Sequence, residues 1–220
     1  MATLHTPDIH PVETFDPINN HTVEFSYTGS QIVRNRAIVL DNETYQTVYD
    51  SVQDRMRPDH VFPGGTFSPG KSYQIRIKVF DAYGNESPFS EPVLFCCYST
   101  PEFRFDALDK NTILHTANPK LTLIYSQKEQ EALQDFQFLL YDYDKTLLTS
   151  SEHKYDASDM NHIFYGLNND REYYVRATGT TDHGLRIETD YIKIRIKYFI
   201  MPDNVLFETK NHHINESTEM

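Results

Sequence analysis

The sequence has 220 residues, a length that allows one large domain or two small ones. Aromatic side chains make up 13% of it, with 15 tyrosines and 14 phenylalanines, which supplies core-forming surface and excludes a wholly disordered chain. The 32 acidic residues outnumber the 20 basic ones, and the resulting net charge of −12 is spread along the whole chain. Without a clustered positive field, the chain is expected to bind neither nucleic acid nor an anionic membrane surface.

Three features bear on the compartment in which the chain is made. Its first residues, Met-Ala-Thr-Leu-His, show neither the basic start nor the apolar run of a secretory signal. No run approaches the roughly 18 apolar residues of a membrane span. The only two cysteines, Cys96 and Cys97, are adjacent and form no disulfide framework. We expect synthesis in a reducing compartment, with one thiol buried and one half-exposed; a vicinal redox pair is the alternative.

Apolar and polar residues alternate along most of the chain, which indicates half-buried strands. The first predicted strands cover residues 23–27 and 37–40. Residues 67–73, Phe-Ser-Pro-Gly-Lys-Ser-Tyr, then place a turn before Tyr73, and Tyr73 opens an alternating run that ends at Gly84. This order of strand, strand, turn and long strand is the first copy of a pattern.

The pattern recurs in the second half of the chain. Its matching landmarks are residues 121–125 against 23–27, at an offset of 98, and Leu167, Tyr173 and Gly184 against Phe67, Tyr73 and Gly84, each at an offset of 100. Residues 136–141 stand where 37–40 stand in the first copy. Helix formers gather only at residues 127–134, a segment too short to be a stable helix by itself.

This duplication predicts an all-β fold of two tandem antiparallel β-sandwiches, in residues 5–98 and 100–200. Residues 201–220 follow as an extended or docking tail. Pro101 would interrupt a strand ladder and marks the seam between the domains. Because the seam is short and has no Gly/Ser stretch, we expect the two domains to be held at a restricted angle.

The spacing around the two tyrosines resembles that of tandem fibronectin type III domains. In that family a leucine and a Pro-Gly or similar turn are followed by a tyrosine that opens strand F, and residues 67–73 and 167–173 match this order, with Phe67 or Leu167 first and Tyr73 or Tyr173 last. The resemblance implies immunoglobulin-like sandwiches in which each tyrosine forms a corner, its ring in the core and its hydroxyl bound to backbone upstream. Tyr27 and Tyr125 occupy the positions of the family's usual strand-B tryptophan.

A second resemblance concerns residues 119–142, which are similar to sandwich domains of minor structural proteins in bacteriophage tails and baseplates. It implies a virion protein, assembled in the host cytoplasm in multiple copies within a symmetric tail tip or fibre. Other tail or baseplate proteins would be its partners, and a host cell-wall saccharide would be a further contact during host attachment.

The motifs of common enzymes are missing from the sequence. It has no metal-binding H-E-x-x-H or C-x-x-C, no phosphate-binding glycine loop and no G-x-S-x-G nucleophile. Acidic pairs near Asp142 and Asp156 lack the remainder of a calcium loop. We therefore expect a non-enzymatic protein with no catalytic residues, metal or cofactor.

Three segments are candidates for partner binding. Tyr83 and Phe89 flank the predicted F–G turn of the first domain, where they either contact a partner or pack on their own sheet. Asp182 and His183 hold the same turn in the second domain. The basic row of the last strand either protects a sheet edge or docks on an acidic neighbour; it consists of Lys193, Arg195 and Lys197.

The third candidate is the apolar triplet Val205, Leu206 and Phe207 in the tail. It has no partner strand in the repeat, so it either docks on a neighbour's edge or groove or packs on its own domain. For the whole chain, the competing functions are a phage tail component, a carbohydrate-binding or adhesion module of a bacterial surface protein, and an accessory domain of an enzyme.

Overall fold

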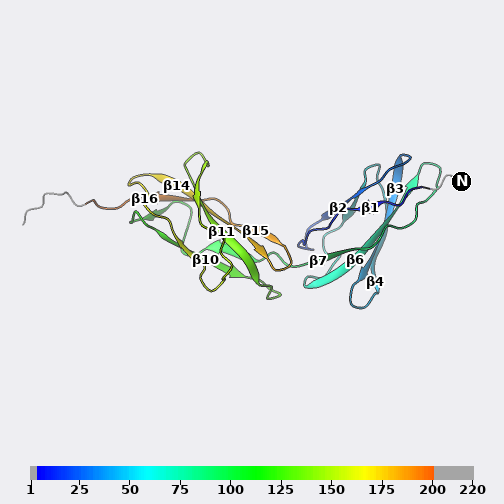
Figure 1. Cartoon of the computed structure of the whole chain (residues 1–220), viewed down its shortest axis with the longest axis horizontal. Coiled ribbons are helices and arrows are strands. Elements are labelled where there is room, and N and C mark those ends of the chain that lie inside the picture. The colour runs from blue at the N-terminus through cyan, green and yellow to red at the C-terminus, as the bar shows by residue number, and fades with distance from the viewer. Residues whose placement is uncertain (1–3, 201–220) are drawn as a thin grey trace, which may run out of the picture.

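The computed structural model describes residues 4–200, which form two β-sandwiches lying end to end (Figure 1). The described part of the chain contains strands and turns and no helix, which confirms the expected all-β class. The first sandwich consists of β1 (Asp8–Ile9), β2 (His21–Ser26), β3 (Ile32–Asp41), β4 (Thr47–Asp54), β5 (Asp59–Phe62), β6 (Lys71–Asp81) and β7 (Val93–Cys97).

The first domain packs a three-stranded sheet, β1-β2-β5, against a four-stranded sheet, β4-β3-β6-β7. The long strand β6 shows why the sequence folds this way, because its side chains alternate between the two faces. Tyr73, Ile75, Ile77 and Val79 point into the core and are at most 2% exposed. Each fully buried aliphatic or aromatic side chain contributes about 1.5–3 kcal/mol to stability.

The second domain repeats the arrangement with nine strands. They are β8 (Glu102–Phe105), β9 (Thr112–Leu114), β10 (Lys120–Ser126), β11 (Leu133–Tyr141), β12 (Leu147–Ser150), β13 (Asn161–Ile163), β14 (Glu172–Thr181), β15 (Arg186–Glu188) and β16 (Ile192–Ile196). One sheet has the order β13-β10-β8, and the other has the order β12-β11-β14-β16-β9, with β15 paired to β14. Its core is separate from the first domain's and is centred on Phe136, Phe138 and Val175.

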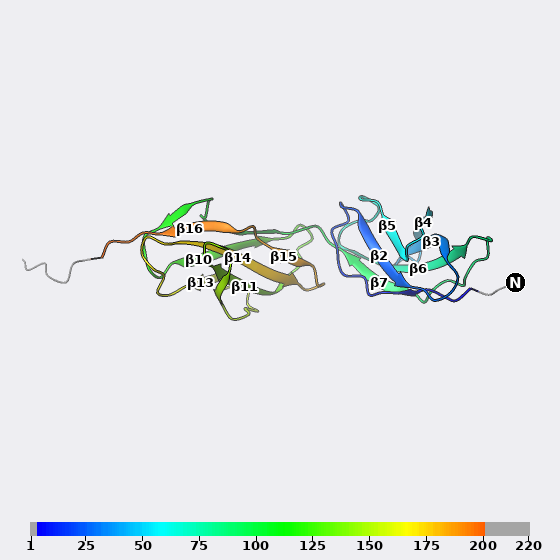
Figure 2. The same ribbon diagram turned by 90° about the horizontal axis from the view of Figure 1, so that it is seen from above.

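In both domains the first stretch of chain is shared between the two sheets. In the first domain β1 pairs with β2, and Phe15 then forms a parallel bridge to Cys97 on β7 of the other sheet. In the second domain β8 pairs with β10, and β9 runs parallel to β16. Seen from above, a single connection from β7 to the second domain joins the two bodies (Figure 2).

Candidate functional site

Both predicted corner tyrosines are buried and bonded to the turn before their strand. The Tyr73 hydroxyl accepts a hydrogen bond from the Ser68 N–H at 3.0 Å and lies 3.3 Å from the Ser68 carbonyl oxygen. The Tyr173 hydroxyl accepts one from the Asn168 N–H at 3.1 Å. These bonds fix the turns at the start of β6 and β14, so the tyrosines act on the scaffold and are not available to a partner.

The connection between the domains, residues 98–101, is bound on both sides by side-chain carboxylates. Thr100 donates to Asp16 Oδ2 of the first domain from its N–H and its hydroxyl, both at 2.7 Å. Ser99 donates to Glu129 of the second domain, from its N–H at 3.2 Å and its hydroxyl at 2.9 Å. Ser99, the first of the two linker residues, is thus held by the second domain, and Thr100, which follows it, is held by the first domain. This crossed pattern opposes both bending and rotation of the linker.

Asp16 is held as a carboxylate at this position. Burial alone would raise the pKa of Asp16, but hydrogen bonds from the Ile18 N–H and from Thr100 outweigh it and keep the pKa below the ordinary 3.8. The Gly70 turn lies next to the same linker, since its N–H donates to the Cys97 carbonyl at 2.7 Å. Gly70 has a φ of +76°, and a Cβ there would lie 3.2 Å from Glu129 Cγ, so glycine permits both the turn and the close approach of the second domain.

His183 occupies the centre of this junction. Its N–H donates to Glu131 Oε1 at 2.8 Å, and its ring Nδ1 lies 3.2 Å from the same oxygen. Its Nε2 lies 3.2 Å from the Tyr98 hydroxyl, and the two rings stack with centroids 4.5 Å apart. With the proton on Nδ1, the ring donates to Glu131 and accepts from Tyr98. Thr14 of the first domain also donates to the His183 carbonyl.

The sequence prediction for the second F–G turn was therefore wrong in one respect. Asp182 and His183 were expected at an outer recognition tip, whereas the turn faces the first domain because the sandwiches are joined end to end. Arg186, beside that turn, lies 3.3 Å from Glu13 of the first domain, although both side chains are largely exposed and the pair contributes little. The two domains thus contact each other directly as well as through the linker.

Tyr83 and Phe89 lie in different environments. Tyr83 is 91% exposed at the tip of the turn after β6, where its N–H donates to Asp81 Oδ1 at 2.9 Å. Phe89 is half-buried against the outer face of the four-stranded sheet, with Lys78 Nζ 5.2 Å from its ring centroid. Only Tyr83 offers a free aromatic ring at the tip, and Phe89 belongs to a groove on the sheet.

The basic row, with Lys193 and Arg195 on β16 and Lys197 directly after it, does not lie on a free sheet edge, which corrects the expectation that the last strand is an edge. β16 lies between β14 and β9, because residues 112–114 add a parallel strand beyond it. Lys193 lies 2.8 Å from Glu172, and Arg195 lies 3.5 Å from Asp170. Lys197 forms no ion pair among residues 4–200. Val205, Leu206 and Phe207, the remaining predicted contacts, lie outside the described residues.

One polar cluster in the core was missed from the sequence. Asn35 and His60 are both fully buried, and His60 Nδ1 lies 2.6 Å from Asn35 Oδ1. His60 Nε2 lies 3.0 Å from the Tyr49 hydroxyl. Burial lowers the pKa of His60 to about 4, and the nearby Arg55 acts in the same direction. The sequence did contain a signal for this cluster, because the alternation of β5 places His60 on the same inward face as Phe62.

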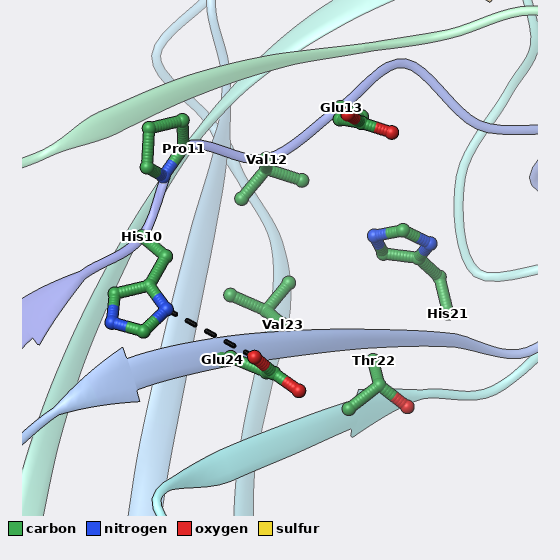
Figure 3. Close-up of a pocket in the computed structure, with 8 residues that line it drawn as sticks. All are labelled: His10, Pro11, Val12, Glu13, His21, Thr22, Val23 and Glu24. Atoms are coloured by element: carbon green, nitrogen blue, oxygen red, sulfur yellow. Dashed lines mark ion pairs between the residues drawn. The ribbon is translucent and has the colours of Figure 1, made fainter. Parts of the chain in front are cut away.

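A second feature missed from the sequence is a pocket where the first strand changes sheets. Its volume is about 190 Å³, and it lies between residues 10–13 and β2 (Figure 3). His10 Nδ1 approaches Glu24 to 4.0 Å, and His21 stacks on Phe15 with ring centroids 3.7 Å apart. Burial lowers the pKa of His21, against the opposing influence of the Glu13 carboxylate. The pocket is smaller than the cavities that hold drug-sized ligands.

The cysteines follow the alternation of β7. Cys97 is buried and Cys96 is half-buried, and both are free thiols. Burial raises the pKa of Cys97 to about 12 and also raises the pKa of Cys96. A raised pKa keeps a thiol protonated and unreactive at neutral pH. Within residues 4–200 no cluster of three or more His, Cys, Asp or Glu side chains could hold a metal ion, and none of the described elements is a helix able to cross a bilayer.

Comparison with known proteins identifies the fold. A scan of protein-family models and a search of curated proteins give no match. Among solved structures, the chicken CNTN1 FN1–FN3 domains are similar, with a TM-score of 0.55 and 10% identity over 89% of this chain and 69% of that one. The fibronectin(III)-like modules of Clostridium thermocellum CbhA give a TM-score of 0.49 at 12% identity, over 87% of this chain and 94% of that one. At this identity the likeness concerns the fold alone, which is that of fibronectin type III-like β-sandwiches.

Proposed function

We propose that this chain is a non-enzymatic structural component of a bacteriophage tail or baseplate, in which it serves as a spacer and a docking module for other virion proteins. In this proposal it is assembled in the host cytoplasm and is present in multiple copies at the tail tip or fibre. The interdomain junction is the observation that carries the proposal. A spacer must transmit position and force from one end to the other, and this junction is built to keep two domains in line.

The junction opposes relative motion in three ways. The linker is short and bound at Ser99 and Thr100 by carboxylates of opposite domains. His183 stacks on Tyr98 and is bound by Thr14. The Glu131 side chain is completely buried beneath it, so that a change of interdomain angle that opens the junction would expose this carboxylate to solvent. Hydrogen bonds to charged groups contribute about 1.5–3 kcal/mol each, so several of them together hold one orientation.

The phage setting is supported by the resemblance of residues 119–142 to tail and baseplate sandwich domains. In the structure this segment contains β10, the middle strand of one sheet of the second domain, and most of β11, an interior strand of the other sheet. Those strands are therefore scaffold, and the docking surfaces of the proposal are the outer faces and tips of the sandwiches.

A second candidate function is a carbohydrate-binding or adhesion module of a bacterial surface protein. Tyr83 favours it, because an aromatic ring that is 91% exposed at a loop tip can stack on a sugar. Tyr83 does not line the first-domain pockets formed by residues 10–13 and β2, by residues 53–55 and 61–63, or by β3, β6 and Phe89. We therefore rank this function second.

Mass spectrometry of particles tests the first function. Phage particles purified by density gradient from the native host should contain this chain at a fixed stoichiometry to the major tail protein, and cross-linking should join it to other tail proteins. Its absence from such particles would refute the proposal. A glycan array tests the second function: binding that Tyr83→Ala abolishes and Tyr165→Ala leaves unchanged would favour it, since Tyr165 is similarly exposed, at 73%.

A further inference from the structure

The outer face of the four-stranded sheet in the first domain holds an apolar groove of about 280 Å³. Its lining residues are Ile38, Leu40, Gln74, Arg76 and Phe89. Two of the cross-strand pairs form its base, because Ile38 is opposite Arg76 and Leu40 is opposite Gln74. Phe89 forms one side, where its ring also contacts Lys78.

Exposed apolar side chains extend the groove. Leu94 lies opposite Gln74 on β7 and is 60% exposed. Val48 and Val52 on the edge strand β4 are 42% and 51% exposed. The same face carries the cations Arg36, Lys78 and Arg76. Arg36 forms an ion pair with Asp50 and Lys78 forms one with Glu86.

The second domain shows which residue covers the equivalent face of its own sheet. Ser90 and Thr189 are equivalent, because each hydroxyl accepts a 3.0 Å hydrogen bond from the long strand, from the Ile77 N–H and the Ala177 N–H respectively. The preceding residues, Phe89 and Glu188, are therefore equivalent too. In the second domain Glu188 forms an ion pair with Arg176, the counterpart of Arg76.

The first domain lacks that carboxylate. With Phe89 in place of an acid, Arg76 is exposed and has no ion pair or side-chain hydrogen bond among residues 4–200. The second domain also fills the equivalent face with the rings of Tyr141 and Tyr174, which stand where Leu40 and Gln74 stand in the first. The groove is thus open and carries a cation whose partner in the other repeat is a carboxylate.

We propose that this groove binds residues 203–208 of a second copy of the chain, in a contact that rests on the docking role proposed above. The segment reads Asp-Asn-Val-Leu-Phe-Glu and has two acids, no base and three consecutive apolar residues. Its Val205, Leu206 and Phe207 side chains supply apolar surface for the groove. A flanking carboxylate, from Asp203 or Glu208, pairs with Arg76 as Glu188 pairs with Arg176.

The distance along the chain makes the contact intermolecular. The chain leaves β16 at the end of the second domain away from the junction (Figure 1). The three residues from 200 to 203 span at most about 11 Å. The ten-residue strand β14, which runs from that end to the junction, spans about 33 Å. The segment therefore reaches the first domain of another molecule. Such a contact is head-to-tail and propagates into a ring or filament.

Sedimentation velocity of the full chain tests the proposal with a matched pair of variants. We expect a mass above the 25.7 kDa of one chain that grows with protein concentration. Phe89→Glu restores the acid of the second repeat next to Arg76 and should block the groove from within. Arg76→Glu should repel the segment. Each should weaken association at least about tenfold, with circular dichroism unchanged.

Charge exchange identifies the occupant. Combining Arg76→Glu with Asp203→Lys and Glu208→Lys should restore association, and changing Val205, Leu206 and Phe207 together to serine should abolish it. A chain that stays monomeric up to about 1 mM would overturn the proposal, because a dissociation constant of that size corresponds to a binding energy of only about 4 kcal/mol. If Phe89→Glu left association unchanged, the groove would not be the binding site. If the serine variant left it unchanged, residues 203–208 would not be the segment that binds. Self-association by a chain absent from phage particles would refute the virion role and leave this contact standing.

Discussion

At the scale of single residues, the two domains place a histidine at the same position of their smaller sheets. His60 lies opposite Val23 on β2, and His162 lies opposite Leu121 on β10. Burial lowers the pKa of both imidazoles. His60 is completely buried, and its ring is bonded at both nitrogens by neutral partners, Asn35 and Tyr49. The first domain therefore buries a neutral histidine, which becomes protonated only in acid.

The first domain should become less stable as the pH is lowered, because of His60. Its pKa is about 4 in the folded chain and near the ordinary 6.5 when unfolded, so between these values the unfolded chain binds more protons. The stabilisation is complete above pH 6.5 and is lost as the pH falls towards 4, by up to about 3 kcal/mol. Calorimetry at pH 7 and pH 4.5 should show a larger fall in melting temperature for wild type than for His60→Gln. An equal fall in both proteins would contradict this assignment.

At the scale of elements, each corner tyrosine ties a turn to the strand that follows it. Tyr73→Phe leaves the Ser68 N–H without its acceptor, and Tyr173→Phe does the same to the Asn168 N–H. We expect each variant to lose about 1–3 kcal/mol of stability in its own domain, because an amide group loses its hydrogen bond. Two calorimetric transitions, one of which shifts in each variant, would report this. Unchanged melting in both variants would show that the corners are not stabilising.

Sequence periodicity was sufficient for the long strands and insufficient for the short ones. The alternation after Tyr73 and Tyr173 predicted β6 and β14, because eight or more residues give the period of two a clear signal. Three-residue strands such as β9 carry no such signal, so the covered edge of β16 could not be foreseen. The error about the basic row follows directly from this, since edge character depends on a partner strand distant in sequence.

The candidate sites show the same limit. The sequence singled out Phe89 from its place near a turn, but its environment depends on which strands lie beside it. The groove is formed by β3, β6 and the segment before β7. That Arg76 lacks a carboxylate partner becomes clear only by comparison with Glu188, which pairs with Arg176 in the other repeat. His183 and Glu131 are brought together by the end-to-end arrangement of the domains, which no local pattern encodes.

At the scale of the whole molecule, the junction decides whether the chain acts as one rigid body. Asp16 and Glu129 hold adjacent linker residues from opposite domains, and neither residue belongs to a hydrophobic core. Asp16→Ala combined with Glu129→Ala should therefore leave both domains folded and release their relative orientation. Residual dipolar couplings should give one common alignment tensor for both domains in wild type and two different tensors in the variant.

The control for this experiment is Glu24→Ala, which removes an exposed carboxylate whose ion-pair partner, His10, belongs to the same domain. It should keep the common tensor, because it breaks no contact between domains. Small-angle scattering should agree, with a broader distribution of maximum dimension only in the double variant. If the double variant keeps one tensor, the stacked Tyr98 and His183 rings are sufficient to hold the angle. Adding His183→Ala to the double variant should then separate the tensors, and a single tensor even in that protein would show that the polar junction is not what aligns the two sandwiches.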